Sequence, residues 1–167
     1  LVARGLAPHS EGPSQGKTRR MAGFLVLLVL VQIYLGALVA GLDAGMAWNT
    51  WPLMDGKLVP DGLMVMQPAW RNLFENALTV QFIHRLGAYL VWIIAVWHMA
   101  AALGSEPGTT HARRAVLLFV LVAVQAGLGI FALLTQVQLH AALAHQGMAL
   151  IVLAFAAAHW RGTKGSY

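Results

Sequence analysis

The sequence of 167 residues contains no cysteine, and only 10% of its residues are charged. The absence of cysteine excludes disulfide bonds, thiolate metal sites and thiol chemistry within these residues. The scarcity of charge argues against an ordinary soluble domain, in which about a quarter of the residues are charged. Hydrophobic residues make up 59% of the sequence, so the fold depends on whether they are periodic or continuous.

The hydrophobic residues form four long runs without a single charged residue. A helix needs about 20 apolar residues to cross about 30 Å of hydrocarbon, whereas a soluble helical core would need polar faces that these runs lack. We therefore predict an all-α membrane protein, a bundle of four transmembrane helices. The predicted spans, each extended around one such run, cover residues 21–41, 81–103, 112–134 and 139–160.

The formal charge of +5 is distributed as in a membrane protein rather than as in a nucleic-acid-binding protein. Basic residues precede the first span, occupy the connection at 104–114 and follow the last span, whereas the long connection at 42–80 also contains four acidic residues. By the positive-inside rule, both termini and 104–114 lie in the cytoplasm. Residues 1–20 are then a cytoplasmic linker without the apolar core of a signal peptide, and residues 161–167 are a cytoplasmic tail.

The four spans divide into two similar helix pairs. The first helix of each pair contains Gln-x-x-x-Gly after a valine, at 31–36 and again at 124–129. The second helix of each pair carries a histidine near its outer end, His84 or His145, followed closely by a glycine. Because both pairs run outward and back in the same order, a pseudo-twofold axis along the membrane normal can relate them.

His84 and His145 are the candidate ligands of a haem iron. At 1.5 Å per residue they lie about 5 Å and about 9 Å below the outer surface, in one layer of the bundle. Such side chains are costly inside a membrane and suggest a function. Haem sites are built from facing helices, and two imidazoles suit haem iron better than a structural zinc, which takes four ligands. The alternative is a pair of histidines that hydrogen-bond between helices.

Neighbouring residues have two interpretations each. Arg85 could pair with a haem propionate or could be an ordinary interfacial arginine. The glycines near the histidines could leave room for a macrocycle, or they could simply allow helices to pack closely. These glycines are Gly87, Gly127, Gly129 and Gly147.

A second histidine pair repeats the spacing of the first. His98 and His159 each follow the first pair by 14 residues, which is about 21 Å of helix and nearly four whole turns. Two-haem cytochromes b use a similar spacing. However, Trp97 and Trp160 beside these histidines indicate the membrane boundary, where amphipathic side chains gather without binding a ligand. One haem is therefore our main hypothesis, with a second haem as the alternative.

The connection at 42–80 is too long for a simple loop, and a stretch of this size usually has a function or structure of its own. It contains several tryptophans and methionines, and three prolines that interrupt helices. We expect a cap on the outer surface above the haem layer, with a short helix at about 72–80 leading into the second span.

Several short motifs resemble the haem A synthase family, and the resemblance covers about residues 20–160. The matching motifs are AGLDAG at 40–45, NTWPLMDG at 49–56, VP at 59–60, NLFEN at 72–76, VQFIHR at 80–85 and AHQ at 144–146. The lack of cysteine is similar to the proteobacterial and mitochondrial members of that family.

The resemblance implies an eight-span enzyme of two four-helix halves, in which this chain is similar to the C-terminal half. That half binds haem b through two histidines, which correspond to His84 and His145. The family oxidises a methyl group of haem O to the formyl group of haem A, for cytochrome oxidase. Haem O and the acidic catalytic residue belong to the N-terminal half, so no catalytic residue is expected here.

The resemblance also implies a multi-pass protein of the bacterial inner membrane. Its expected partners are membrane lipid, the N-terminal half, haem O synthase and cytochrome oxidase assembly factors, with no nucleic acid. Two other functions stay open on the residues alone. One is a stand-alone electron-transfer cytochrome b with one or two haems, and the other is a membrane interaction module without a cofactor.

Overall fold

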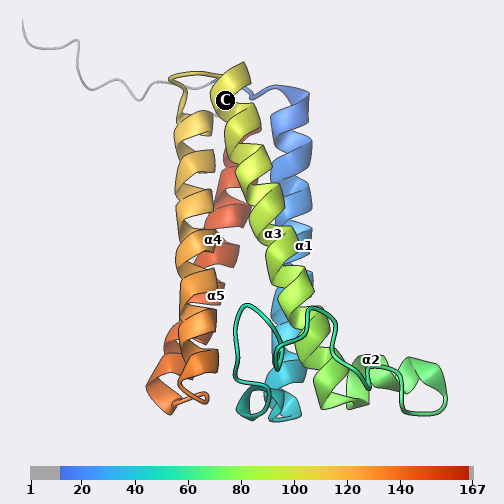
Figure 1. Cartoon of the computed structure of the whole chain (residues 1–167). Coiled ribbons are helices and arrows are strands. Elements are labelled where there is room, and N and C mark those ends of the chain that lie inside the picture. The colour runs from blue at the N-terminus through green and yellow to red at the C-terminus, as the bar shows by residue number, and fades with distance from the viewer. Residues whose placement is uncertain (1–11, 166–167) are drawn as a thin grey trace, which may run out of the picture.

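The structure, a computed structural model, describes residues 12–165 and confirms the predicted all-α class (Figure 1). Its four long helices are each long and apolar enough to cross a membrane. They are α1 (Gly16–Gly41), α3 (Ala77–Ser105), α4 (Thr110–Leu134) and α5 (Leu139–Gly162). Three short elements lie between α1 and α3, namely η1 (Ala44–Met46), η2 (Ala69–Arg71) and α2 (Asn72–Glu75). No strand forms within residues 12–165.

Two of the long helices begin at side-chain caps. The Asn76 side chain accepts hydrogen bonds from the backbone N–H groups of Leu78 and Thr79, and the Thr109 side chain accepts one from Ala112. The helix α1 begins at Gly16, inside the segment that we predicted as a linker. Hydropathy marks only the part of a helix that lies in hydrocarbon, so it misses a first turn rich in basic residues.

The four long helices form a ring in the order α1, α3, α4, α5. Each helix packs against its two neighbours in this ring, so α1 and α4 form one diagonal while α3 and α5 form the other. One end of the bundle holds the α3–α4 connection, and the other holds residues 42–76 and the turn at 135–138 (Figure 1). We call residues 42–76 the cap and this end the cap end. Which end faces the cytoplasm stays a prediction.

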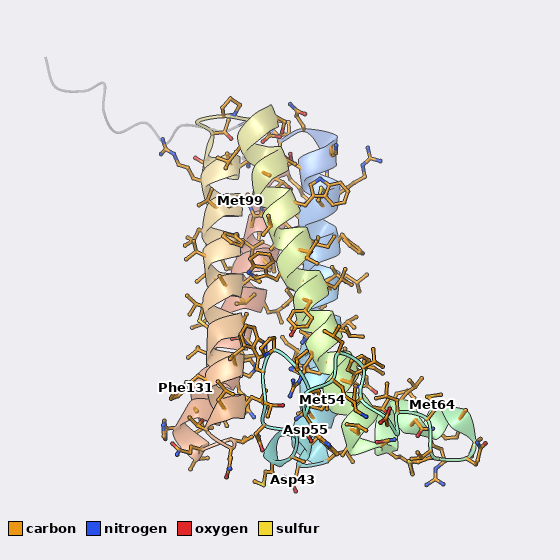
Figure 2. The ribbon with its side chains drawn as sticks, in the orientation of Figure 1. Asp43, Met54, Asp55, Met64, Met99 and Phe131 are labelled. Atoms are coloured by element: carbon orange, nitrogen blue, oxygen red, sulfur yellow. The ribbon has the colours of Figure 1, made fainter. Side chains whose placement is uncertain are left out.

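The cap extends to one side of the bundle. Met54, which is buried, and Asp55 lie beside the helices, whereas Met64 lies at the far side of the cap, away from them (Figure 2). The element α2 lies in this projecting part (Figure 1).

The central hydrophobic cluster of the bundle takes two buried residues from each long helix. The eight residues are Leu25 and Val29 of α1, Val91 and Ala95 of α3, Leu118 and Val122 of α4, and Val152 and Ala156 of α5. Within each helix the two residues are four positions apart, so they lie one above the other on the same face. This cluster therefore forms two stacked layers that hold all four helices together.

The core also shows how far the two helix pairs repeat each other. Every buried residue of α1 has a buried counterpart in α4 that is 93 positions later, as for Leu25 and Leu118. Every buried residue of α5 has a buried counterpart in α3 that is 61 positions earlier, as for Val152 and Val91. The same offsets relate Gln32 to Gln125 and His84 to His145. The repeat therefore extends through the packing of the whole bundle.

Candidate haem site

His84 lies in α3 near the cap end, and two residues of α1 hold its ring. The Gln32 side-chain Nε2 lies 3.0 Å from His84 Nδ1 and also donates a hydrogen bond of 2.9 Å to the His84 backbone carbonyl. Gly36 lies one turn further along α1, where a Cβ atom would stand 3.1 Å from His84 Cε1. The amide and the bare backbone of α1 together fix the orientation of the ring.

His145 has the same surroundings in the second helix pair. The Gln125 Nε2 of α4 lies 3.2 Å from His145 Nδ1. A Cβ on Gly129 would stand 2.7 Å from His145 Cε1, closer than real Cβ contacts. The Gln-x-x-x-Gly repeat of the sequence is therefore a cradle for one histidine in each pair.

The two histidines lie on the diagonal helices α3 and α5. Each ring has its Nδ1 atom against a glutamine, whereas neither His84 Nε2 nor His145 Nε2 makes a hydrogen bond within residues 12–165. Both rings are partly buried. The arrangement therefore leaves two Nε2 atoms without a hydrogen-bond partner in the described residues, one on each of the two diagonal helices.

The donor set fits haem iron better than a bare metal ion. Among residues 12–165 there is no group of three or more His, Cys, Asp or Glu side chains that could hold a metal ion. Haem iron needs only one or two axial ligands from the protein, because the macrocycle supplies the other four. Two imidazoles on facing helices of a bundle satisfy that requirement.

The neighbouring glycines serve other purposes than room for a macrocycle. A Cβ on Gly87 would overlap the Gln32 Oε1 atom, so this glycine makes room for the amide of α1. Gly127 and Gly147 are exposed, and a Cβ on either would meet no atom within 4 Å. Gly127 is two positions after Gln125, and Gly147 is two positions after His145. Two positions correspond to a rotation of about 200° around the helix, so both glycines face away from the bundle interior.

Arg85 holds the cap. Its guanidinium donates hydrogen bonds of 2.8 Å to the Thr50 carbonyl and 2.6 Å to the Trp48 carbonyl. Gln81, one turn earlier in α3, is buried and donates 2.8 Å hydrogen bonds to the carbonyls of Ala44 and Ala47. We predicted Arg85 at the outer boundary; in the structure it lies at the cap end, and its hydrogen bonds go to the backbone of the cap and to the Gln81 side chain. Its role toward a haem propionate stays a prediction.

Asn49 connects the cap to the second helix pair. Its side-chain amide donates hydrogen bonds of 2.6 Å to the Gly45 carbonyl and 2.9 Å to the Leu133 carbonyl near the end of α4. The NTWPLMDG segment that carries the family resemblance thus begins with a residue that joins the cap to α4. Because α3 holds the same segment through Arg85, the cap spans both helix pairs.

The second histidine pair is buried, contrary to our interpretation of these residues as boundary side chains. His98 and His159 are each only 1% exposed, and their Nε2 atoms lie 2.8 Å apart. An iron between two imidazoles needs those nitrogens about 4 Å apart, because each imidazole–metal bond is about 2 Å long. The geometry therefore favours one hydrogen-bonded pair over a second haem.

The remaining histidines lie outside the candidate site. His140 is exposed at the start of α5. His111, which carried no signal in the sequence, is buried at the start of α4, where its Nε2 lies 3.1 Å from the Gly12 carbonyl. His9 lies outside the described residues. Sequence reasoning did find the Gln-x-x-x-Gly repeat but missed that its glutamines contact the histidines.

Comparison with known proteins explains this architecture. The family model for COX15-CtaA, described as a cytochrome oxidase assembly protein, matches residues 2–157. The chain belongs to the COX15-CtaA family. This membership confirms the family resemblance and, with the four apolar helices, makes the chain part of a multi-pass membrane protein family.

Individual members of the COX15-CtaA family are similar over the whole chain. Proteins named heme A synthase from Mesorhizobium japonicum and a Chelativorans species are each 68% identical, over 167 and 166 residues. The heme A synthase of Rhizobium meliloti is 60% identical over 167 residues. In each case the matched region covers at least 99% of this chain but only 46% of the relative, so the chain spans about half the length of these relatives. The comparison with solved structures found no match.

Proposed function

We propose that this chain is the haem-b-binding half of a haem A synthase of the bacterial inner membrane, in which His84 and His145 would bind the haem iron. One observation carries the proposal. In both histidines the Nδ1 atom is against a glutamine of the neighbouring helix and the Nε2 atom is left without a hydrogen bond within residues 12–165. A repeat that merely packed helices together would not need a free imidazole nitrogen in the same place twice.

The role in haem A synthesis comes from the relatives. Proteins named heme A synthase share 60–68% of the residues of this chain. The complete enzyme would oxidise a methyl group of haem O to the formyl group of haem A for cytochrome oxidase. Because the chain spans about half the length of these relatives, we place the catalytic residues and haem O in the other half. A bound haem b would supply one-electron chemistry to that reaction.

The residues of this chain would hold and shield the haem. His84 and His145 would bind the iron from the two diagonal helices, and Gly36 and Gly129 would keep their rings in place. The cap, held by Gln81 and Arg85, would cover the haem layer at the cap end. Arg85 Nε is buried with no partner within residues 12–165, which leaves one donor for a haem propionate.

The test is the optical spectrum of the whole chain after expression in haem-replete cells. We expect a low-spin spectrum with two histidine ligands, and we expect His84→Ala or His145→Ala to abolish it. His140→Ala is the matched control, because this histidine lies on the same helix as His145 but is exposed. Retention of the spectrum in both ligand variants would rule out the assignment.

A further inference from the structure

The two glutamines of the candidate site share an unusual feature. The side-chain oxygens of both Gln32 and Gln125 are buried and have no hydrogen-bond partner within residues 12–165. In both, the amide nitrogen lies against Nδ1 of a histidine, at 3.0 Å for His84 and 3.2 Å for His145. A buried acceptor without a partner costs about 1–3 kcal/mol, so its occurrence at both positions of the repeat requires an explanation.

The chemistry of a coordinated imidazole supplies one. When Nε2 of a neutral imidazole binds iron, the ring carries its hydrogen on Nδ1, which becomes a donor. The glutamine Nε2 is also a donor, so it cannot accept the hydrogen on Nδ1. The glutamine Oε1 is an acceptor and can do so. A half-turn of the amide group exchanges its nitrogen and oxygen with almost no change of shape. The buried oxygen and the Nδ1–H group would then satisfy each other.

We propose that Gln32 and Gln125 are the positioning residues of the two axial histidines, each accepting a hydrogen bond from Nδ1–H through Oε1. This inference rests on the proposed function, because it assumes that His84 and His145 bind iron. Histidines that bind metals almost always donate their other ring N–H group, which fixes the tautomer and raises the basicity of the ligand. A more basic ligand stabilises ferric iron and so lowers the reduction potential.

The two glutamines are not equivalent. Gln32 Nε2 also donates to the His84 carbonyl at 2.9 Å. A half-turn would lose this hydrogen bond and bring Oε1 against the carbonyl oxygen, which also accepts. The Gln125 side chain makes no hydrogen bond other than the one to His145 Nδ1 within residues 12–165, so its amide turns without a comparable loss. We therefore expect the hydrogen bond at Gln125 to have the larger effect on the haem.

The experiment compares reduction potentials and haem retention of the whole chain carrying haem b. Gln125→Leu removes the acceptor, and Gln125→Glu replaces it with a stronger one. We expect a more positive potential in the first variant and a more negative one in the second. Loss of a residue that hydrogen-bonds to a metal ligand typically weakens metal binding about 10-fold to 100-fold, so haem retention in Gln125→Leu should fall by that factor. Gln32→Leu and Gln32→Glu should shift the potential in the same directions by less.

The control is Gln138→Leu, since Gln138 is exposed in the turn before α5 and makes no side-chain cap. Potentials equal to wild type in Gln125→Leu and Gln125→Glu would overturn the role of the glutamines. If Gln125→Leu retains no haem, Gln125→Glu decides, because glutamate keeps an acceptor at this position. A more negative reduction potential in Gln125→Glu supports the inference, and an unchanged potential refutes it. A wild-type chain without a two-histidine spectrum would instead refute the proposed function itself.

Discussion

His98 and His159 lie opposite each other on the diagonal helices α3 and α5, with their Nε2 atoms 2.8 Å apart. Each histidine occupies the same place in its helix pair, 61 positions apart in the sequence. One Nε2 donates and the other accepts, so the two equivalent positions share a single proton. The pair lies beyond the two core layers as seen from the candidate haem site, and it joins the diagonal helices at the opposite end of the bundle.

This pair should behave as one energetic unit. Replacing either histidine by leucine leaves the Nε2 of the other ring unpaired, in addition to its Nδ1, which is already buried without a partner within residues 12–165. His98→Leu and His159→Leu should therefore each lower the free energy of unfolding by about 1–3 kcal/mol. The double variant should cost clearly less than the sum of the two, because it removes both polar groups. Thermal unfolding in a mild detergent measures the coupling.

The haem content of the His98 and His159 variants is the control for this comparison of single and double variants. Both single variants should keep the haem spectrum, since the proposed ligands His84 and His145 lie about four helical turns away. Additive losses of stability would show that the two histidines are energetically independent. If the wild-type chain bound two haems and either variant lost one of them, the hypothesis of two haems would be restored, against the 2.8 Å separation of the two Nε2 atoms.

The bare backbone beside each candidate ligand histidine, His84 and His145, gives a second prediction. Gly129→Ala would place a Cβ 2.7 Å from His145 Cε1, and Gly36→Ala would place one 3.1 Å from His84 Cε1. Both rings should be displaced, the first more than the second, with weaker haem retention in that order. Gly127→Ala is the matched control on α4, because its Cβ would meet nothing within 4 Å. Titration of haem loss measures all three, and equal retention in Gly129→Ala and Gly127→Ala would contradict the cradle.

Gln81 should contribute strongly to the stability of the cap. Its buried amide satisfies the carbonyls of Ala44 and Ala47, so Gln81→Met should cost about 1–3 kcal/mol. The matched variant Gln67→Met changes an exposed glutamine of the same cap and should cost less than about 0.5 kcal/mol. Thermal unfolding compares the two, and equal midpoints would show that the carbonyls find other partners.

The two interpretations of Arg85 lead to different outcomes in one experiment. Arg85→Gln removes the guanidinium that holds the Trp48 and Thr50 carbonyls. If the cap contacts dominate, local opening of the cap should become easier by about 1–2 kcal/mol, and amide exchange near residues 44–55 roughly 5-fold to 30-fold faster. Hydrogen exchange by mass spectrometry measures this. Loss of haem with unchanged exchange would instead assign Arg85 to a propionate.

Much of the fold follows from the sequence because hydrocarbon admits few solutions. Long runs without charge require helices in which every backbone group is paired, so the number of spans and their approximate limits can be predicted. The matched histidines and the Gln-x-x-x-Gly repeat likewise indicated two related helix pairs. The short sequence motifs indicated the same protein family that the comparison with known proteins shows.

Only the tertiary structure decided which side chains meet. Gln32 and His84 are 52 positions apart, and nothing local in the sequence says how far each helix is rotated about its axis. That rotation places Gly129 against a ring but Gly127, two positions earlier, on the outside. It also buries His98 against His159, which the neighbouring tryptophans had suggested were boundary residues. Hydropathy determined that four helices cross the membrane, and packing between them determined what the site can hold.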